Sequence, residues 1–397
     1  MAIRRRTFLK VIGAATASRV VFGQGQTPTV GVVGGGIVGA SIAFHLSSAG
    51  ADVVLFEKKA PAAGATSKSF AWINAHTNDP HYRSLRLKSI AAYRDLDKTL
   101  GLNVVWGGAI NWATTLAEAE RLKASSREFR RDEYDSVIVG ADELAKLVPN
   151  IRLGSFEAAI FNSMDGHIDP VEVTRKLLAA ARSRGTEVVI PCEVNELKFQ
   201  GDRLTGVSTT MGDFSLDRIV IAGGVDTPEL AAQTGYSPPL KHAPGILLHT
   251  TPQKSVLGRV MESVNMNLKQ NPNGRLVGND APYAPDLPVH QEIIHGVADM
   301  PEEIRAMHGE RILEKFRQLM PGSVDANYDF LTLGYRPMPE DGMPVAGFSP
   351  GSPHVYLAVM HSGVTLAPIM GRYITRELLM EEAVDELAPY RPHRFAG

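Results

Sequence analysis

The sequence holds a single cysteine, Cys192, among its 397 residues. It can therefore form no internal disulfide, and a structural zinc site built from several cysteines is excluded, so we predict no metal site. Basic residues are not in excess, because the formal net charge at pH 7 is -2. No nucleic-acid partner is expected, since a phosphate-binding surface needs a basic stripe. No run of about 18 apolar residues occurs, so no transmembrane span is expected.

Hydrophobic residues make up 44% of the chain and charged residues 21%. These fractions are those of a globular protein and not of a disordered or membrane-embedded one. The length is sufficient for two domains of ordinary size and for a large buried core.

A basic segment lies at the N-terminus. Residues 4–10 read Arg-Arg-Arg-Thr-Phe-Leu-Lys and precede a short apolar stretch at 11–17. The order Arg-Arg-x-Phe-Leu-Lys is typical of a twin-arginine export signal. We therefore expect residues 1–27 to be a signal and linker, the twin-arginine export machinery to be a partner, and the protein to be periplasmic or secreted. The alternative is a basic N-terminus on a cytoplasmic protein.

A glycine-rich turn follows the first β-branched segment. Residues 29–33 predict a buried parallel strand, residues 34–39 read Gly-Gly-Gly-Ile-Val-Gly, and residues 40–48 predict a helix. A second strand is predicted at 53–56 and ends in Glu57. This order is that of a dinucleotide-binding unit, in which such an acid binds the ribose diol of NAD or FAD. The alternatives are a turn without a ligand and a solvated Glu57.

Each position of the turn has a physical task. Gly34 allows the tight turn, Gly36 leaves room for a pyrophosphate, and Gly39 lets the helix and strand approach closely. Ile37 and Val38 begin the helix, whose free N–H groups and partial positive charge attract phosphates. The turn therefore predicts a dinucleotide site, although it does not distinguish NAD from FAD.

Helices and strands continue to alternate along the rest of the chain. Helices are predicted at 82–96, 116–125, 171–183, 304–319 and 366–379, and strands at 187–191, 194–199, 204–209, 218–222, 266–269, 275–277 and 355–359. Residues 334–342 interrupt this regularity, and the proline-containing residues 281–290 predict a surface loop or a lid. A strand, a glycine turn and a helix occur near each end of the chain, which indicates one domain assembled from separated segments.

Six blocks occur in order along the chain: the turn at 34–39, Gly-Ala-Thr-Ser at 64–67, Gly-His-Ile-Asp-Pro at 166–170, Ile-Ala-Gly-Gly at 221–224, Gly-Tyr-Arg-Pro at 334–337, and His-Ser-Gly-Val-Thr-Leu-Ala-Pro at 361–368. In this order they resemble the D-amino-acid oxidase, glycine oxidase and sarcosine oxidase family of flavoenzymes. The resemblance implies an α/β (α+β) fold with two domains. A Rossmann-like FAD-binding domain would comprise residues 28–75, 160–240 and 330–390, and a substrate domain with a mixed or antiparallel sheet would comprise residues 76–159 and 241–329.

The resemblance implies FAD as the cofactor and assigns positions that would bind it. These are Gly34, Gly36, Ile37, Val38, Gly39, Glu57, Lys58, Thr66, Ser67, Ala71, Trp72, Val194, Gly223, Gly363 and Val364. Family members that tether flavin through a cysteine carry it at or near the position of Gly334. Because Cys192 lies elsewhere, FAD is expected to be non-covalent.

Two residues are assigned to the catalytic centre. Arg336 matches the family arginine that binds the substrate carboxylate, and its guanidinium suits a carboxylate in two parallel bonds. The alternative is an ion pair with Glu340 or Asp341. His361 is either a neighbour of the flavin or a capping residue. His249 and Lys269 are further polar candidates, for which a structural role is the favoured interpretation.

The resemblance implies the FAD-dependent oxidation of a small amine or amino acid. The substrate would pass a hydride to flavin N5 and leave an imine that water hydrolyses, which requires orientation and exclusion of water more than acid–base groups. Oxygen, a quinone or a carrier protein would accept the electrons. The alternatives are an exported flavoprotein with a non-amine substrate or a non-catalytic role, and an NAD-dependent dehydrogenase.

Overall fold

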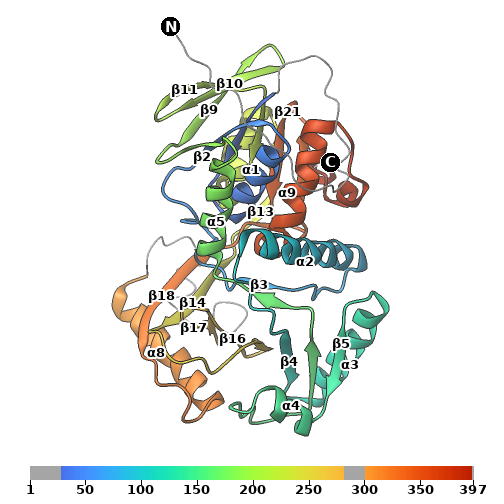
Figure 1. Ribbon diagram of the computed structural model, residues 1–397, viewed down its shortest axis with the longest axis vertical. Coiled ribbons are helices and arrows are strands. Elements are labelled where there is room, and N and C mark those ends of the chain that lie inside the picture. Colours follow the sequence, from blue (N-terminus) through green and yellow to red (C-terminus); the bar gives the residue numbers. More distant parts are fainter. Residues whose placement is uncertain (1–27, 281–299, 396–397) are drawn as a thin grey trace, which may run out of the picture.

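The computed structural model describes residues 28–280 and 300–395, which form two lobes (Figure 1). One lobe is built on a six-stranded sheet and the other on an eight-stranded sheet. Residues 1–27, which include the expected export signal, and the loop predicted at 281–290 lie outside the described residues.

The six-stranded sheet is mostly parallel. Its order is β20 (Val345–Ser349), β21 (Ser352–Val359), β12 (Arg218–Ile221), β1 (Thr29–Val33), β2 (Asp52–Phe56) and β8 (Glu187–Val189). Only β20 runs antiparallel to its neighbour. The central strands are apolar on both faces, which is typical of a parallel sheet covered on two sides. Val30, Val32 and Leu55, for example, are fully buried.

Helices α1 (Ile37–Ser48), α5 (Pro170–Arg182) and α9 (Gly363–Met380) pack together beside this sheet (Figure 1). The helix predicted at 171–183 is confirmed as α5, which Asp169 caps through the backbone N–H groups of Val171 and Glu172 and in which Pro170 occupies the first turn. Three smaller sheets accompany the lobe: β9 (Val194–Gln200), β10 (Arg203–Thr209) and β11 (Gly212–Ser215); β13 (Leu240–Lys241) with β19 (Met338–Pro339); and β3 (Trp72–Ile73) with β7 (Gly166–His167).

The eight-stranded sheet has the order β18 (Tyr328–Tyr335), β14 (Pro244–Thr250), β17 (Leu276–Asn279), β16 (Met266–Gln270), β15 (Val260–Ser263), β4 (Ala109–Ala113), β6 (Ala158–Asn162) and β5 (Ser136–Val139). The strands predicted at 266–269 and 275–277 are present as β16 and β17, which pair as an antiparallel hairpin. The remaining helices are α2 (Pro80–Leu100), α3 (Leu116–Arg131), α4 (Ala141–Leu147), α6 (Thr227–Ala231) and α8 (Glu302–Leu319). Within the described ranges, no helix has the length and apolar character needed to cross a membrane.

Side chains alternate between the two faces of the eight-stranded sheet in β4 and β15. Ile110 and Met261 point to one face, where they join a buried apolar cluster with Phe316 of α8. Their strand neighbours Asn111 and Glu262 point to the other face. The sheet therefore has an apolar face toward α8 and a polar face toward the other lobe.

Three sequence-based boundaries need correction. The interruption predicted at residues 334–342 begins too early, because Gly334 and Tyr335 continue β18 and pair with Gly245 and Pro244 of β14. The boundaries predicted at residues 160 and 330 fall inside β6 and β18, which both belong to the eight-stranded sheet. Pairing with strands distant in sequence extends both elements beyond what local composition indicates.

The C-terminal segment is fastened to α9 by a buried carboxylate. Glu377 accepts hydrogen bonds from the Tyr356 hydroxyl at 2.6 Å and the Val384 backbone at 2.8 Å, and it binds Arg391 through both oxygens. Because only 4% of the Glu377 side chain is exposed, its loss would leave the guanidinium without its charge partner in a largely buried site.

We therefore expect Glu377→Ala to lower the free energy of unfolding by about 3 kcal/mol, measured by urea denaturation. Glu382→Ala is the matched control, because that carboxylate pairs with Arg376 on the surface and should contribute less than about 1 kcal/mol. Equal effects of the two substitutions would contradict this account.

Candidate functional site

A cavity of about 520 Å³ lies at the carboxyl ends of four neighbouring parallel strands. Its walls are formed by residues that directly follow β1, β2, β12 and β21. This edge is where open α/β sheets bind ligands, because the loops after adjacent parallel strands converge there. Of the residues singled out from the sequence, the cavity is lined by Gly34, Gly36, Ile37, Val38, Glu57, Lys58, Thr66, Val194, Gly223, His361, Gly363 and Val364.

The glycine-rich turn requires its glycines for steric reasons. Gly34 has φ +107°, and a Cβ atom there would lie 2.5 Å from the carbonyl oxygen of Ala222. A Cβ atom on Gly39 would lie 2.0 Å from the carbonyl oxygen of Gly34. Gly39 thus acts by allowing α1 to contact the turn, and it does not itself line the cavity.

Two helices direct their N-termini into the same cavity. The N-cap residues of α1 and α9, Gly36 and Ser362, make no side-chain capping hydrogen bond, and neither first turn carries an acidic residue. The N–H of Ile37 donates to Thr66 Oγ1 at 3.1 Å, which holds the following loop against the start of α1. Each helix start contributes unpaired N–H groups and a partial positive charge. The cavity therefore suits a ligand with anionic or electron-rich groups at two separate places.

The acidic residue at the end of β2 is held in a defined orientation. Glu57 accepts hydrogen bonds from the backbone N–H groups of Gly35 at 2.7 Å and Lys59 at 2.8 Å. Lys58 binds Asp226 at 3.0 Å, and this hydrogen bond raises the pKa of the Lys58 ammonium. The cavity thus combines a carboxylate at one end with two helix starts, an arrangement that fits a dinucleotide.

Three other predicted cofactor residues lie beside the cavity without lining it. The Ser67 hydroxyl donates to the Gly64 carbonyl at 3.4 Å. Ala71 has φ +56°, a left-handed conformation, and its carbonyl accepts the N–H of Ile168. Trp72 donates from Nε1 to Asp165 at 3.0 Å. Their assignment to FAD stays a prediction, as does that of the lining residues.

Sequence reasoning missed part of the lining. Val225, Asp226, Glu229 and Gln233 also form the cavity wall. They follow the Gly223-Gly224 turn after β12, so the recurrence of a strand and glycine turn was the signal that could have indicated them.

Arg336 lies directly after β18. Its Nε and Nη2 atoms donate to the carbonyl oxygens of Ala243 at 3.3 Å and Pro244 at 3.1 Å. Asp341, one of the carboxylates considered as its ion-pair partner, instead accepts hydrogen bonds from Arg394 at 2.7 and 3.1 Å. The backbone bonds fix the direction of the Arg336 guanidinium.

His361 is solvent-accessible in the cavity wall. The surrounding protein still displaces much of the bulk water, and together with the charges of Arg336 and Arg86 this lowers the pKa of His361 to about 4. The imidazole is therefore neutral at neutral pH. The two arginines add to the positive potential near the start of α9.

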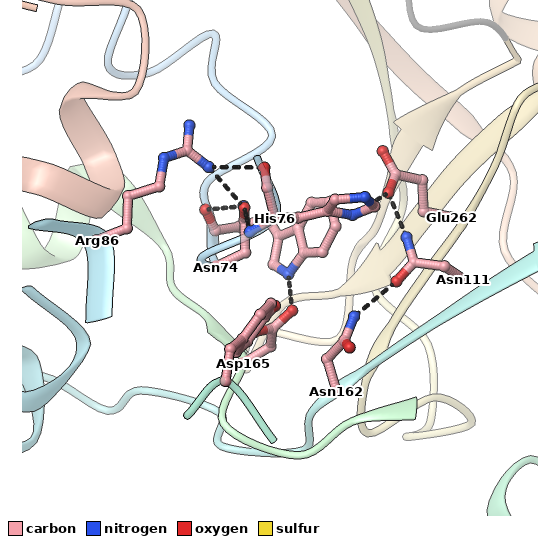
Figure 2. Close-up of polar contacts among 9 residues, drawn as sticks. Asn74, His76, Arg86, Asn111, Asn162, Asp165 and Glu262 are labelled. Carbon is pink, nitrogen blue, oxygen red and sulfur yellow. Dashed lines mark hydrogen bonds and ion pairs between the residues drawn. The ribbon is translucent and has the colours of Figure 1, made fainter. Parts of the chain in front are cut away.

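A polar network that the sequence did not indicate extends from Arg86 toward Glu262 in the second lobe (Figure 2). Arg86 of α2 donates to Asn74 Oδ1 at 2.8 Å, to the His76 carbonyl at 3.2 Å, and to the hydroxyl of Ser362, the residue before α9. Asp165 accepts from Trp72 and from the Tyr134 hydroxyl. No motif connects these residues, because they come from segments that are far apart in the sequence.

The two polar candidates of the eight-stranded sheet have close protein contacts. Lys269 is 1% exposed and donates to the carbonyl of Ile168 at 2.7 Å, and burial lowers its pKa to about 7. The ring of His249 stacks on Phe330 with centroids 4.5 Å apart. These contacts agree with a structural role for each residue.

Comparison with known proteins identifies the family. The model of the family described as "DAO: FAD dependent oxidoreductase" matches residues 29–377. Dimethylglycine dehydrogenase of Mus musculus is 27% identical over 92% of this chain, and this chain spans only 44% of its length. Glycine oxidase of Bacillus licheniformis is 27% identical over 88% of this chain and 92% of its own.

The crystal structure of glycine oxidase from Geobacillus kaustophilus superposes with a TM-score of 0.82 at 25% identity, covering 94% of this chain and all of that chain. The expected fold class, with its Rossmann-like domain, is thereby confirmed. Because the family match extends over most of the chain, this protein belongs to the DAO family of FAD-dependent oxidoreductases.

Proposed function

We propose that the protein oxidises a small amine or amino acid with FAD as its cofactor. The observation that carries the proposal is the cavity into which α1 and α9 both direct their N-termini, in a chain of an FAD-dependent family. Relatives named for the oxidation of glycine and dimethylglycine support a substrate with a C–N bond next to the reacting hydrogen. Bound flavin would accept that hydrogen as hydride, and the resulting imine would be hydrolysed by water.

The residues of this chain would mainly bind and orient. The start of α1 would hold the pyrophosphate, Glu57 the adenosine ribose, and the start of α9 the electron-rich end of the flavin. Arg336 would bind the substrate carboxylate, and its backbone contacts with Ala243 and Pro244 support a fixed approach direction. We assign no general base, because the substrate reacts as a neutral amine.

The primary test is the visible spectrum of the purified protein, recorded before and after anaerobic addition of pooled amino acids and N-methyl amines. Flavin bands that bleach would support the proposal, and subsequent rapid mixing with oxygen would separate an oxidase from an enzyme that uses a quinone or carrier protein. Flavin bands that persist would favour a non-amine substrate or a non-catalytic role. A colourless protein that takes up no added FAD would contradict the cofactor proposal.

Glu57→Gln should weaken FAD binding about tenfold, because the amide removes the charge that strengthens a hydrogen bond to the ribose diol. The dissociation constant is measured by titrating the apoprotein with FAD and following flavin fluorescence. Glu196→Gln on the exposed part of β9 is the control and should leave the constant unchanged. Equal constants for all three proteins would remove Glu57 from the cofactor site.

Arg336→Leu should lower kcat/KM for a carboxylated substrate at least about tenfold, through the loss of a charge-assisted bidentate contact. FAD content, read from the ratio of visible to ultraviolet absorbance, should stay that of the unmodified protein. Unchanged kinetics would exclude Arg336 from carboxylate binding.

We propose further that the protein is exported by the twin-arginine pathway, on the strength of Arg5, Arg6 and the following Thr-Phe-Leu-Lys. That pathway carries folded proteins, so the enzyme would bind FAD before export. Cell fractionation of the unmodified chain and of the double substitution Arg5→Lys, Arg6→Lys tests this proposal. The same compartment for both would contradict it.

A further inference from the structure

The strands of the eight-stranded sheet carry two acidic residues, Glu262 and Asp329. Asp329 is bound by Arg275. Glu262 lies in β15 directly opposite Asn111 of β4, on the polar face of the sheet. Its side chain faces the segment that follows β3, since Glu262 Oε2 lies 3.9 Å from Nδ1 of His76.

An amide relay holds the Glu262 carboxylate in place (Figure 2). Asn162 of β6 donates from Nδ2 to Asn111 Oδ1 at 2.9 Å, and Asn111 donates from Nδ2 to Glu262 Oε2. Because the first bond occupies the Asn111 carbonyl, its NH₂ group is directed at Glu262. Within the described residues Glu262 Oε1 has no hydrogen-bond donor, and 30% of the side chain remains exposed.

No lysine or arginine of the described ranges forms an ion pair with Glu262. The neighbouring His76 does not replace one, because burial and the charges of Arg86 and Arg83 lower its pKa to about 4 and leave it neutral. Burial in turn raises the pKa of Glu262 to about 7. Asp165 is the other nearby titratable group, and burial raises its pKa as well. A buried carboxylate without a counter-charge is costly, so it either takes up a proton or binds a cation.

Glu262 is connected to the cofactor cavity through this network. The His76 carbonyl accepts from Arg86, and Arg86 donates to Ser362 immediately before α9. Arg336 follows β18, four strands from β15 in the same sheet. The strand registers place Glu262 across from Thr332, four residues before Arg336. With about 4.8 Å between neighbouring strands and about 3.4 Å per residue along a strand, the two backbones lie on the order of 23 Å apart. A ligand that contacts both side chains would therefore have to carry its charges several bonds apart.

We propose that Glu262 binds a second, positively charged group of the substrate, so that the preferred substrates are diamino acids or diamines. The inference rests on the proposed amine or amino-acid oxidation. The contact fits a distal ammonium and not the reacting nitrogen, because the reacting amine must be neutral when its hydride leaves. The Glu262 carboxylate has no other cationic partner among the described residues, so a substrate with a distal cation would be preferred over one without it.

The test uses the FAD-loaded protein and two matched substrate pairs, ornithine with norvaline and lysine with norleucine, each as both enantiomers. Anaerobic stopped-flow mixing gives the half-saturating concentration for flavin reduction. The unmodified protein should show a value at least about tenfold lower for the cationic member of a pair. Glu262→Gln keeps the size of the side chain and an oxygen that accepts from Asn111. It should bring the ratio of the half-saturating concentrations of the neutral and cationic members of each pair close to one, without changing the values for norvaline or norleucine.

Glu143→Gln on the exposed α4 makes the same chemical change in the same lobe and should keep the preference. No preference in the unmodified protein, or a preference that survives Glu262→Gln, would overturn the inference while the reduction of flavin upholds the proposed function. If no amine reduces the bound flavin, the proposed function fails. Binding of 1,5-diaminopentane against pentylamine, followed by the change in tryptophan fluorescence to which Trp72 beside His76 contributes, then decides whether Glu262 selects cations.

Discussion

The contact between α1 and the turn after β1 is the constraint on which the functional site depends. Gly39 brings the helix against the carbonyl of Gly34, and no larger residue fits there. This contact directs the start of α1 into the cavity at the carboxyl edge of the sheet. Ser41 of the same helix donates to the carbonyl of Ala367, which fastens α9 alongside α1. Two helix starts thereby contribute positive potential to one cavity.

The second lobe presents a polar surface that carries a carboxylate, in contrast to the positive potential of the two helix starts. Strand alternation directs Ile110 and Met261 into the apolar cluster under α8 and leaves Asn111 and Glu262 facing the first lobe. The two lobes also carry unpaired charges of opposite sign. Within the described residues, Arg86 beside α9 has no carboxylate partner, and Glu262 has no cationic partner. The space between the lobes therefore carries unbalanced charges of both signs, which a zwitterionic or multiply charged small molecule would balance.

Local patterns anticipated much of the first lobe and less of the second. The predicted helix at 171–183 corresponds to α5, because Asp169 and Pro170 are a capping signal that acts within one turn. By contrast, β4, β6 and β14 were not predicted, although each is an interior strand of the larger sheet. The ends of these strands are defined by partner strands far away in sequence, as the pairing of Gly245 in β14 with Gly334 in β18 illustrates.

By itself the sequence determined the dinucleotide turn, the acid after β2 and the family, because each depends on residues close together or on blocks in a fixed order. Only the tertiary structure decided which polar groups of the two lobes meet. Asn162, Asn111 and Glu262 become neighbours through the registers of β6, β4 and β15, and Arg86 reaches Ser362 through the packing of α2 on α9. Strand register and helix packing bring together residues that are distant along the chain, and no local spacing records which of them will touch.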